Sequence, residues 1–120
     1  MEKLTLDLFE IILVLFSSIS FIVYGILFFT SVKMREEFDR FGLSSYAALT
    51  GVLEVLGGIG LFIGLKVTII LLLASGGLTL LMLLGFGVRM KMKDGFWLSF
   101  PSAFFMAVNS YIFLIAARLT

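Results

Sequence analysis

A single carboxylate stands inside an apolar, glycine-rich stretch of the sequence, TGVLEVLGGIGLFIG, which runs from Thr50 to Gly64. This residue, Glu54, has a side chain that can hold a proton, a cation or a hydrogen-bond donor. Three other polar residues in apolar surroundings or at their edge are candidates to share a site with it: Tyr24, Arg89 and Asn109. Together they have the chemistry to hold the polar head of a small amphipathic ligand or to handle a proton.

The composition indicates where such a site would lie. Of the 120 residues, 61% are hydrophobic and only 14% are charged, and the mean hydropathy is +1.18. These values are typical of integral membrane proteins. The formal net charge is +1 and there is no basic tract, so we expect a lipid bilayer around the chain and no nucleic acid as a partner.

Several kinds of chemistry are disfavoured, because the sequence contains no histidine and no cysteine. A nucleophile–base pair of the Ser–His or Cys–His kind is therefore unavailable. The usual ligands of b-type haem and iron–sulfur clusters are also missing. The acids Glu10 and Glu54 would lie near opposite faces of a membrane, too far apart to act as a pair. We therefore expect no catalytic residues, no metal and no cofactor, and the sequence favours a non-catalytic protein.

Four apolar segments supply the elements that must position these side chains. They span residues 8–31, 46–65, 67–87 and 97–117, and each is close to the roughly 20 residues that a helix needs to cross the hydrocarbon core. They predict an all-α polytopic membrane protein, an antiparallel four-transmembrane-helix bundle in a single domain, 1–120. The first segment is too long for a signal peptide and lacks a cleavage site, so we expect it to be retained.

The connecting segments predict the orientation. Residues 33–45 have the pattern of an amphipathic interfacial turn, with Met34, Phe38 and Phe41 at helical spacing and Gly42 at its end. Loops 32–45 and 88–96 hold Lys33, Arg35, Arg40, Arg89, Lys91 and Lys93, whereas the other side holds Lys3, Lys66 and Arg118. This excess predicts that the two loops are cytoplasmic and that both termini lie outside.

Each predicted helix has one face that is smaller or more polar than the rest, which favours packing through these faces. In the second helix, Glu54 shares such a face with Gly51, Gly58 and Leu61. We assign helix packing to the glycines of this helix: Gly51, Gly57, Gly58, Gly60 and Gly64. Glu54 should then point into the bundle and be held by Arg89, Tyr24 or both. Whether it is a structural clasp or a ligand or proton site is left open.

Two long segments resemble the DoxX-like family of small four-helix membrane proteins: EEFDRFGLSSYAALTGVLEVLGGIGLFIGL and LLMLLGFGVRMKMKDGFWLSFPSAFFMAVNSYIFL. The resemblance rests on Phe-x-x-Phe-Gly at residues 38–42, Gly-x-x-Glu-x-x-Gly at residues 51–57, and Leu-Met before Arg89. It rests also on the charged loop after Arg89, and on Pro101 with Asn109. It implies association with membrane redox or other complexes, since the family is named for a subunit associated with a thiosulfate:quinone oxidoreductase.

Two hypotheses of different class follow, both placed in the bacterial cytoplasmic membrane. In the first, the chain is a non-catalytic accessory or assembly subunit that contacts another membrane protein or further copies of itself. In the second, the bundle encloses a pocket in which Glu54, Arg89, Tyr24 and Asn109 hold a quinone or another lipid-like molecule. A transporter is a third and weaker option, because no inverted repeat or broken helix is evident.

Overall fold

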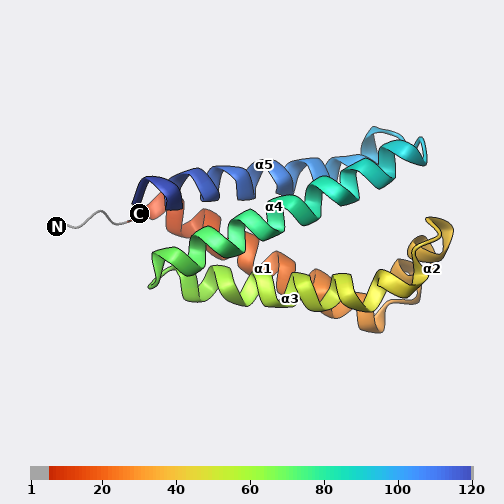
Figure 1. Ribbon diagram of the computed structural model, residues 1–120, viewed down its shortest axis with the longest axis horizontal. Helices are drawn as coiled ribbons and strands as arrows, with labels where there is room; N and C mark the ends of the chain where they lie inside the picture. Colours follow the sequence, from red (N-terminus) through yellow and green to blue (C-terminus); the bar gives the residue numbers. More distant parts are fainter. Residues whose placement is uncertain (1–5, 120) are drawn as a thin grey trace.

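The fold is entirely helical over the part of the chain that the structure describes. The structure is a computed structural model, and it describes residues 6–119. Its elements are α1 (Leu8–Thr30), α2 (Val32–Arg40), the short 3-10 helix η1 (Ser44–Tyr46), α3 (Ala47–Gly64), α4 (Thr68–Lys91) and α5 (Phe96–Leu119). Figure 1 shows how the α-helices are arranged. No strand occurs between residues 6 and 119. The predicted all-α class is confirmed.

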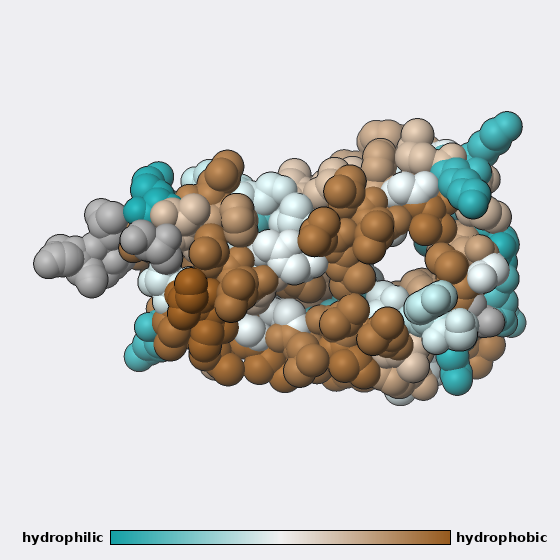
Figure 2. Space-filling model, viewed as in Figure 1, coloured by the Kyte–Doolittle hydropathy of each residue, from teal (hydrophilic) through white to brown (hydrophobic). Residues whose placement is uncertain are grey.

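Four of these helices are long and apolar enough to cross a membrane. Helices α1, α3, α4 and α5 have 23, 18, 24 and 24 residues, against the roughly 20 that span a hydrocarbon core. Many of their large apolar side chains are exposed on the isolated chain, among them Leu8, Leu73 and Leu114. Figure 2 shows a predominantly apolar middle with hydrophilic residues gathered toward the two ends. The chain is a helical integral membrane protein, and a lipid bilayer surrounds its apolar surface.

Local sequence explains where the helices begin and end. Asp7 caps α1 by accepting a hydrogen bond from the Glu10 backbone N–H at 2.8 Å, and the Glu10 side chain accepts one from the Asp7 N–H in return. This reciprocal pair satisfies two donors that a helix start otherwise leaves free. Helix α4 continues to Lys91 rather than ending at residue 87. Residues 88–91 contain no helix breaker, and Arg89 and Lys91 favour a helix C-terminus.

The predicted interfacial turn is a separate helix, α2. Ser31 caps its start by accepting a hydrogen bond from the Met34 N–H at 3.3 Å. Gly42 follows its end with φ +76°, a left-handed conformation that glycine adopts without steric cost. The chain then turns through η1 into α3, so that α2 lies at one end of the α1 and α3 pair (Figure 1). We refer to this end of the molecule as the α2 end.

The long helices associate as two pairs. Helix α1 lies along α3 and α4 lies along α5, while α3 and α4 are joined through the tight turn at Lys66 and Val67. The contact between α1 and α5 is smaller. In Figure 1 the chain reverses direction from each long helix to the next, and the two pairs lie farther apart toward the α2 end. A buried core joins them, formed by Val14, Phe21, Leu61, Leu71, Leu78, Ile112 and their neighbours.

Candidate functional site

A cavity of about 620 Å³ lies between the two helix pairs at the α2 end. Figure 2 shows an opening in the surface toward this end. The walls are mostly apolar and include seven aromatic residues: Phe21, Tyr24, Phe28, Phe38, Phe41, Tyr46 and Phe105. The volume lies within the roughly 300–1,000 Å³ range of small-molecule sites. The Met34, Phe38 and Phe41 side chains of the predicted interfacial turn all line this cavity.

Glu54 lies in the wall of the cavity on α3 and is only 5% exposed. Its helix register explains this position. Gly51 and Gly58, one turn before and after it, are buried like Leu61, as predicted for this face. Among residues 6–119, no side chain or backbone group donates a hydrogen bond to the Glu54 carboxylate. Burying a carboxyl group without a hydrogen-bond partner costs free energy, so the missing partner needs an explanation.

In the structure, Glu54 forms no hydrogen bond or ion pair with Arg89 or Tyr24. The prediction that one or both of these residues hold the Glu54 side chain is therefore wrong. Tyr24 lines the same cavity but is 42% exposed and makes an edge-to-face contact with the Phe105 ring. Arg89 also lines the cavity, but its guanidinium pairs with carboxylates of the connecting segments. The structure thus brings Glu54, Arg89 and Tyr24 to one cavity without joining them by hydrogen bonds.

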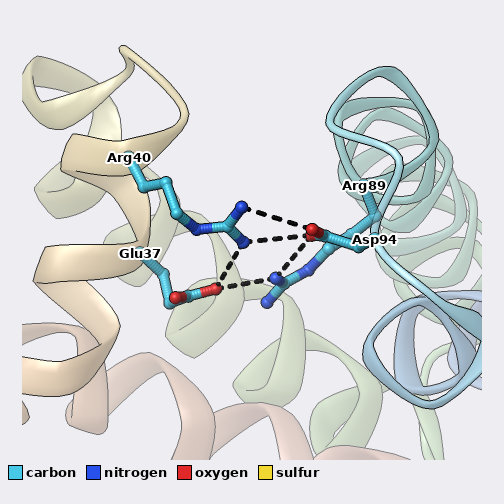
Figure 3. Close-up of polar contacts among 4 residues, drawn as sticks. All are labelled: Glu37, Arg40, Arg89 and Asp94. Carbon is cyan, nitrogen blue, oxygen red and sulfur yellow. Dashed lines mark hydrogen bonds and ion pairs between the residues drawn. The ribbon is translucent and has the colours of Figure 1, made fainter.

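Arg89 belongs to a network of four charged residues, shown in Figure 3: Glu37, Arg40, Arg89 and Asp94. Arg89 Nη1 donates to Glu37 Oε1 at 2.7 Å and to Asp94 Oδ2 at 2.9 Å. Arg40 Nη2 donates to the same two oxygens at 3.0 and 3.1 Å, and its Nη1 reaches Asp94 Oδ1 at 3.2 Å. Two cations and two anions alternate, so the charges within the network balance.

The network connects α2 to the end of α4 and to the loop that follows it. It therefore ties the two helix pairs together at the end where they diverge. The ring of Phe41 lies beneath both guanidiniums, with Arg40 Cζ at 5.0 Å and Arg89 Cζ at 4.9 Å from its centroid. The hydrogen bonds that Arg40 and Arg89 donate lower the pKa of Glu37 and the pKa of Asp94 below their ordinary values, and the bonds from Arg40 have the larger effect.

Asn109 lies in a different part of the molecule and does not line the cavity. Its side chain is 0% exposed. Its Oδ1 accepts a hydrogen bond from Ser17 Oγ at 3.2 Å, and its Nδ2 donates to the Phe105 carbonyl at 2.9 Å. The bond from Ser17 joins α1 to α5, whereas the bond to Phe105 lies within α5. The prediction that Asn109 shares a ligand pocket with Glu54 is therefore corrected.

The glycines of α3 lie against two different helices. A Cβ atom at Gly51 would come within 2.9 Å of Phe28 Cβ, and one at Gly58 within 2.8 Å of the Ser18 carbonyl oxygen, both on α1. Gly57, Gly60 and Gly64 face α4 instead, where a Cβ would lie 2.5–3.0 Å from Leu78, Ala74 and Leu71, respectively. Ser18 Oγ also donates to the Gly58 carbonyl at 2.6 Å. Their lack of side chains lets α3 approach both neighbours closely.

Sequence reasoning missed the roles of Glu37, Arg40 and Asp94. The sequence did contain a signal for these contacts. Loops 32–45 and 88–96 are predicted to lie on the same side of the membrane, and they carry opposite charges that can pair. It also missed Gly25 on α1, where a Cβ would lie 2.8 Å from the Gly51 carbonyl oxygen. Residues 6–119 contain no cluster of three or more His, Cys, Asp or Glu side chains that could hold a metal ion.

Comparison with known proteins agrees with the helical membrane architecture. The profile of the DoxX-like family matches residues 11–117, which include α2, α3 and α4 and all but the outer ends of α1 and α5. No curated protein and no solved structure matches the chain. The family match covers most of the sequence, including Glu54 and the charged network, and the chain belongs to the DoxX-like family.

Proposed function

We propose that this protein binds a small amphipathic molecule within the membrane, in the cavity at the α2 end, with Glu54 as the polar anchor. One observation carries the proposal: a carboxylate that is only 5% exposed lines a cavity of about 620 Å³ and has no donor among residues 6–119. Buried polar groups are normally hydrogen-bonded. A ligand with a polar head would supply the missing partner, and its apolar body would contact the aromatic walls.

The proposal places the four long helices across the bilayer as an antiparallel bundle. The α2 end then faces the cytoplasm, in keeping with the Lys and Arg residues of loops 32–45 and 88–96. Lys3, which enters the charge count for the opposite side, lies outside the described residues. In this orientation an amphipathic ligand enters the cavity near a membrane surface and keeps its apolar part at the depth of the hydrocarbon.

An accessory or assembly role has less support from the geometry. The exposed apolar side chains of α1, α3, α4 and α5 are what a bilayer requires of membrane-spanning helices. They do not by themselves call for a protein partner. The cavity and the unpartnered carboxylate, by contrast, are not needed to cross a membrane, and ligand binding accounts for both.

Saturable binding of simple amphiphiles tests the proposal. The chain in phosphatidylcholine nanodiscs is titrated with tritiated dodecylamine, dodecanol and dodecanoate, and binding to empty nanodiscs is subtracted. We expect saturable one-to-one binding of at least one probe. Val88→Trp should abolish it, because Val88 lines the cavity and a larger side chain would fill it.

Leu83→Trp is the matched control, because Leu83 lies on the same helix, is exposed, and does not line the cavity. This variant should bind the probes like the unmodified chain. The proposal fails if no probe binds saturably, or if Val88→Trp and Leu83→Trp bind equally well.

A further inference from the structure

We infer that the cavity takes an amphipathic amine, with its ammonium group against Glu54 and its apolar body along the aromatic walls. This inference rests on the proposed function and adds the chemical class of the ligand. It follows from the charges around the cavity, from its aromatic lining, and from the absence of a cation paired with Glu54 among residues 6–119.

The charges around the cavity leave one carboxylate unmatched. The cavity lining includes one carboxylate, Glu54, and one guanidinium, Arg89. The guanidinium is already bound by Glu37 and Asp94, and Arg40 completes that network with a second positive charge. The network is neutral by itself and has no net positive charge left for Glu54. A ligand that carries a cation would complete the site.

The hydroxyl groups of the lining do not replace such a cation. Thr50 Oγ1 donates its hydrogen bond to the Tyr46 carbonyl at 2.9 Å. The hydroxyl groups of Tyr24, Tyr46 and Ser102, which also line the cavity, do not donate to Glu54 in this structure. A carboxylate head would be repelled by Glu54, and a neutral hydroxyl head would make a hydrogen bond without balancing the charge.

The aromatic walls suit a cation as well. Phe28 and Phe38 meet edge to face at 5.0 Å between ring centroids, and Phe21 and Phe105 do so at 5.3 Å. All four residues line the cavity. Aromatic faces attract ammonium groups and also contact alkyl chains. The guanidiniums over Phe41 show that rings of this site already contact cations.

The ranking of the three probes tests the inference. We expect the unmodified chain to bind dodecylamine about tenfold more tightly than dodecanol. The reason is that hydrogen bonds between charged groups are stronger than hydrogen bonds between neutral groups. Dodecanoate should bind most weakly. Dodecanol binding as tight as that of dodecylamine would overturn the inference and leave the proposed function standing, whereas absence of all binding would overturn the function itself.

Two variants identify the carboxylate. Glu54→Gln should bring the affinity for dodecylamine down to that for dodecanol, while dodecanol binding shows that the variant is folded. Glu10→Gln is the matched control. Glu10 is also buried, but it lies near the start of α1, away from the cavity, and pairs with Arg118. If Glu54→Gln keeps the full preference for the amine, the inference is wrong. The ranking in the unmodified chain decides the question even where a variant does not fold.

The ammonium group has two sources, a free alkylamine or the head of an aminophospholipid. Nanodiscs in which phosphatidylethanolamine replaces half of the phosphatidylcholine distinguish them. Loss of dodecylamine binding in these nanodiscs would support a lipid ammonium as the ligand. Unchanged binding would support a free amine.

Discussion

Arg89 Nη1 lies 2.7 Å from Glu37 Oε1, although the two residues are 52 positions apart in the sequence. This pairing joins the end of α4 to α2. It also engages a guanidinium that lines the cavity and leaves Glu54 without it. The same contact therefore ties the two helix pairs together at the α2 end and leaves unmatched the carboxylate on which the proposed function depends.

Acidification should loosen the network at the α2 end. The hydrogen bonds from Arg40 and Arg89 lower the pKa of Glu37 and that of Asp94 from their ordinary values of 4.5 and 3.8. The network therefore makes its full contribution to stability when the pH is above these ordinary pKa values. Its contribution is lost as the pH falls through the lowered values. We expect the melting temperature in nanodiscs to fall between about pH 5 and about pH 3.

The variant Asp94→Asn provides the comparison for this pH dependence. It removes one of the two carboxylates whose pKa is lowered, so its melting temperature should be lower at neutral pH and should change less on acidification. An Asp94→Asn profile parallel to that of the unmodified chain would show that the network does not contribute to stability.

Two glycine variants should differ in stability because of their surroundings. Gly58→Ala would place a Cβ 2.8 Å from the Ser18 carbonyl oxygen and should destabilise by about 1–3 kcal/mol. Gly77→Ala on α4 meets nothing within 4 Å and should be neutral or stabilise by up to about 1 kcal/mol. Unfolding in mixed micelles measures both. Equal effects would contradict the close approach of α3 to α1.

The hydrogen bond between Ser17 and Asn109 should contribute a small coupling energy between α1 and α5. A double-mutant cycle of Ser17→Ala and Asn109→Ala should give about 0.6 kcal/mol, the average for such bonds in membrane helices. Probe binding should stay unchanged in Asn109→Ala, because Asn109 does not line the cavity. Zero coupling, or a loss of binding, would show that the role assigned to Asn109 is wrong.

Labelling of single cysteines tests the orientation, and the chain has no cysteine of its own. Ser45→Cys at the α2 end should react with an impermeant thiol reagent from the cytoplasmic side, and Lys66→Cys from the opposite side. Both positions are exposed. The reverse pattern would place the cavity opening on the outer side of the membrane.

The helices and the burial of Glu54 could be predicted from the sequence because both follow from local patterns. An apolar run of about 20 residues fixes a membrane-spanning helix within a few positions. Helical spacing places Glu54 on the same face as Gly51 and Gly58, which allow the closest packing. The end of α4 was less predictable, because no breaker separates its apolar part from the basic residues that continue it.

The partners of the polar side chains could not be predicted in this way. Arg89 was expected to bind Glu54, but its actual partners come from α2 and from the loop after α4. Choosing between them requires knowing where α2 lies relative to α4. The position of Asn109 depends similarly on which neighbouring helix its face meets. A helical repeat gives the direction of a side chain around its own axis but not the element opposite it.

An experimental structure of the protein with bound 12-bromododecylamine would test the central claim most directly. The anomalous signal of bromine would locate the end of the alkyl chain. We predict a bromine peak among the aromatic walls of the cavity, with the ammonium nitrogen within hydrogen-bonding distance of the Glu54 carboxylate. A bromine peak outside the cavity, or an ammonium group bound to Glu37 and Asp94 in place of Glu54, would contradict the account.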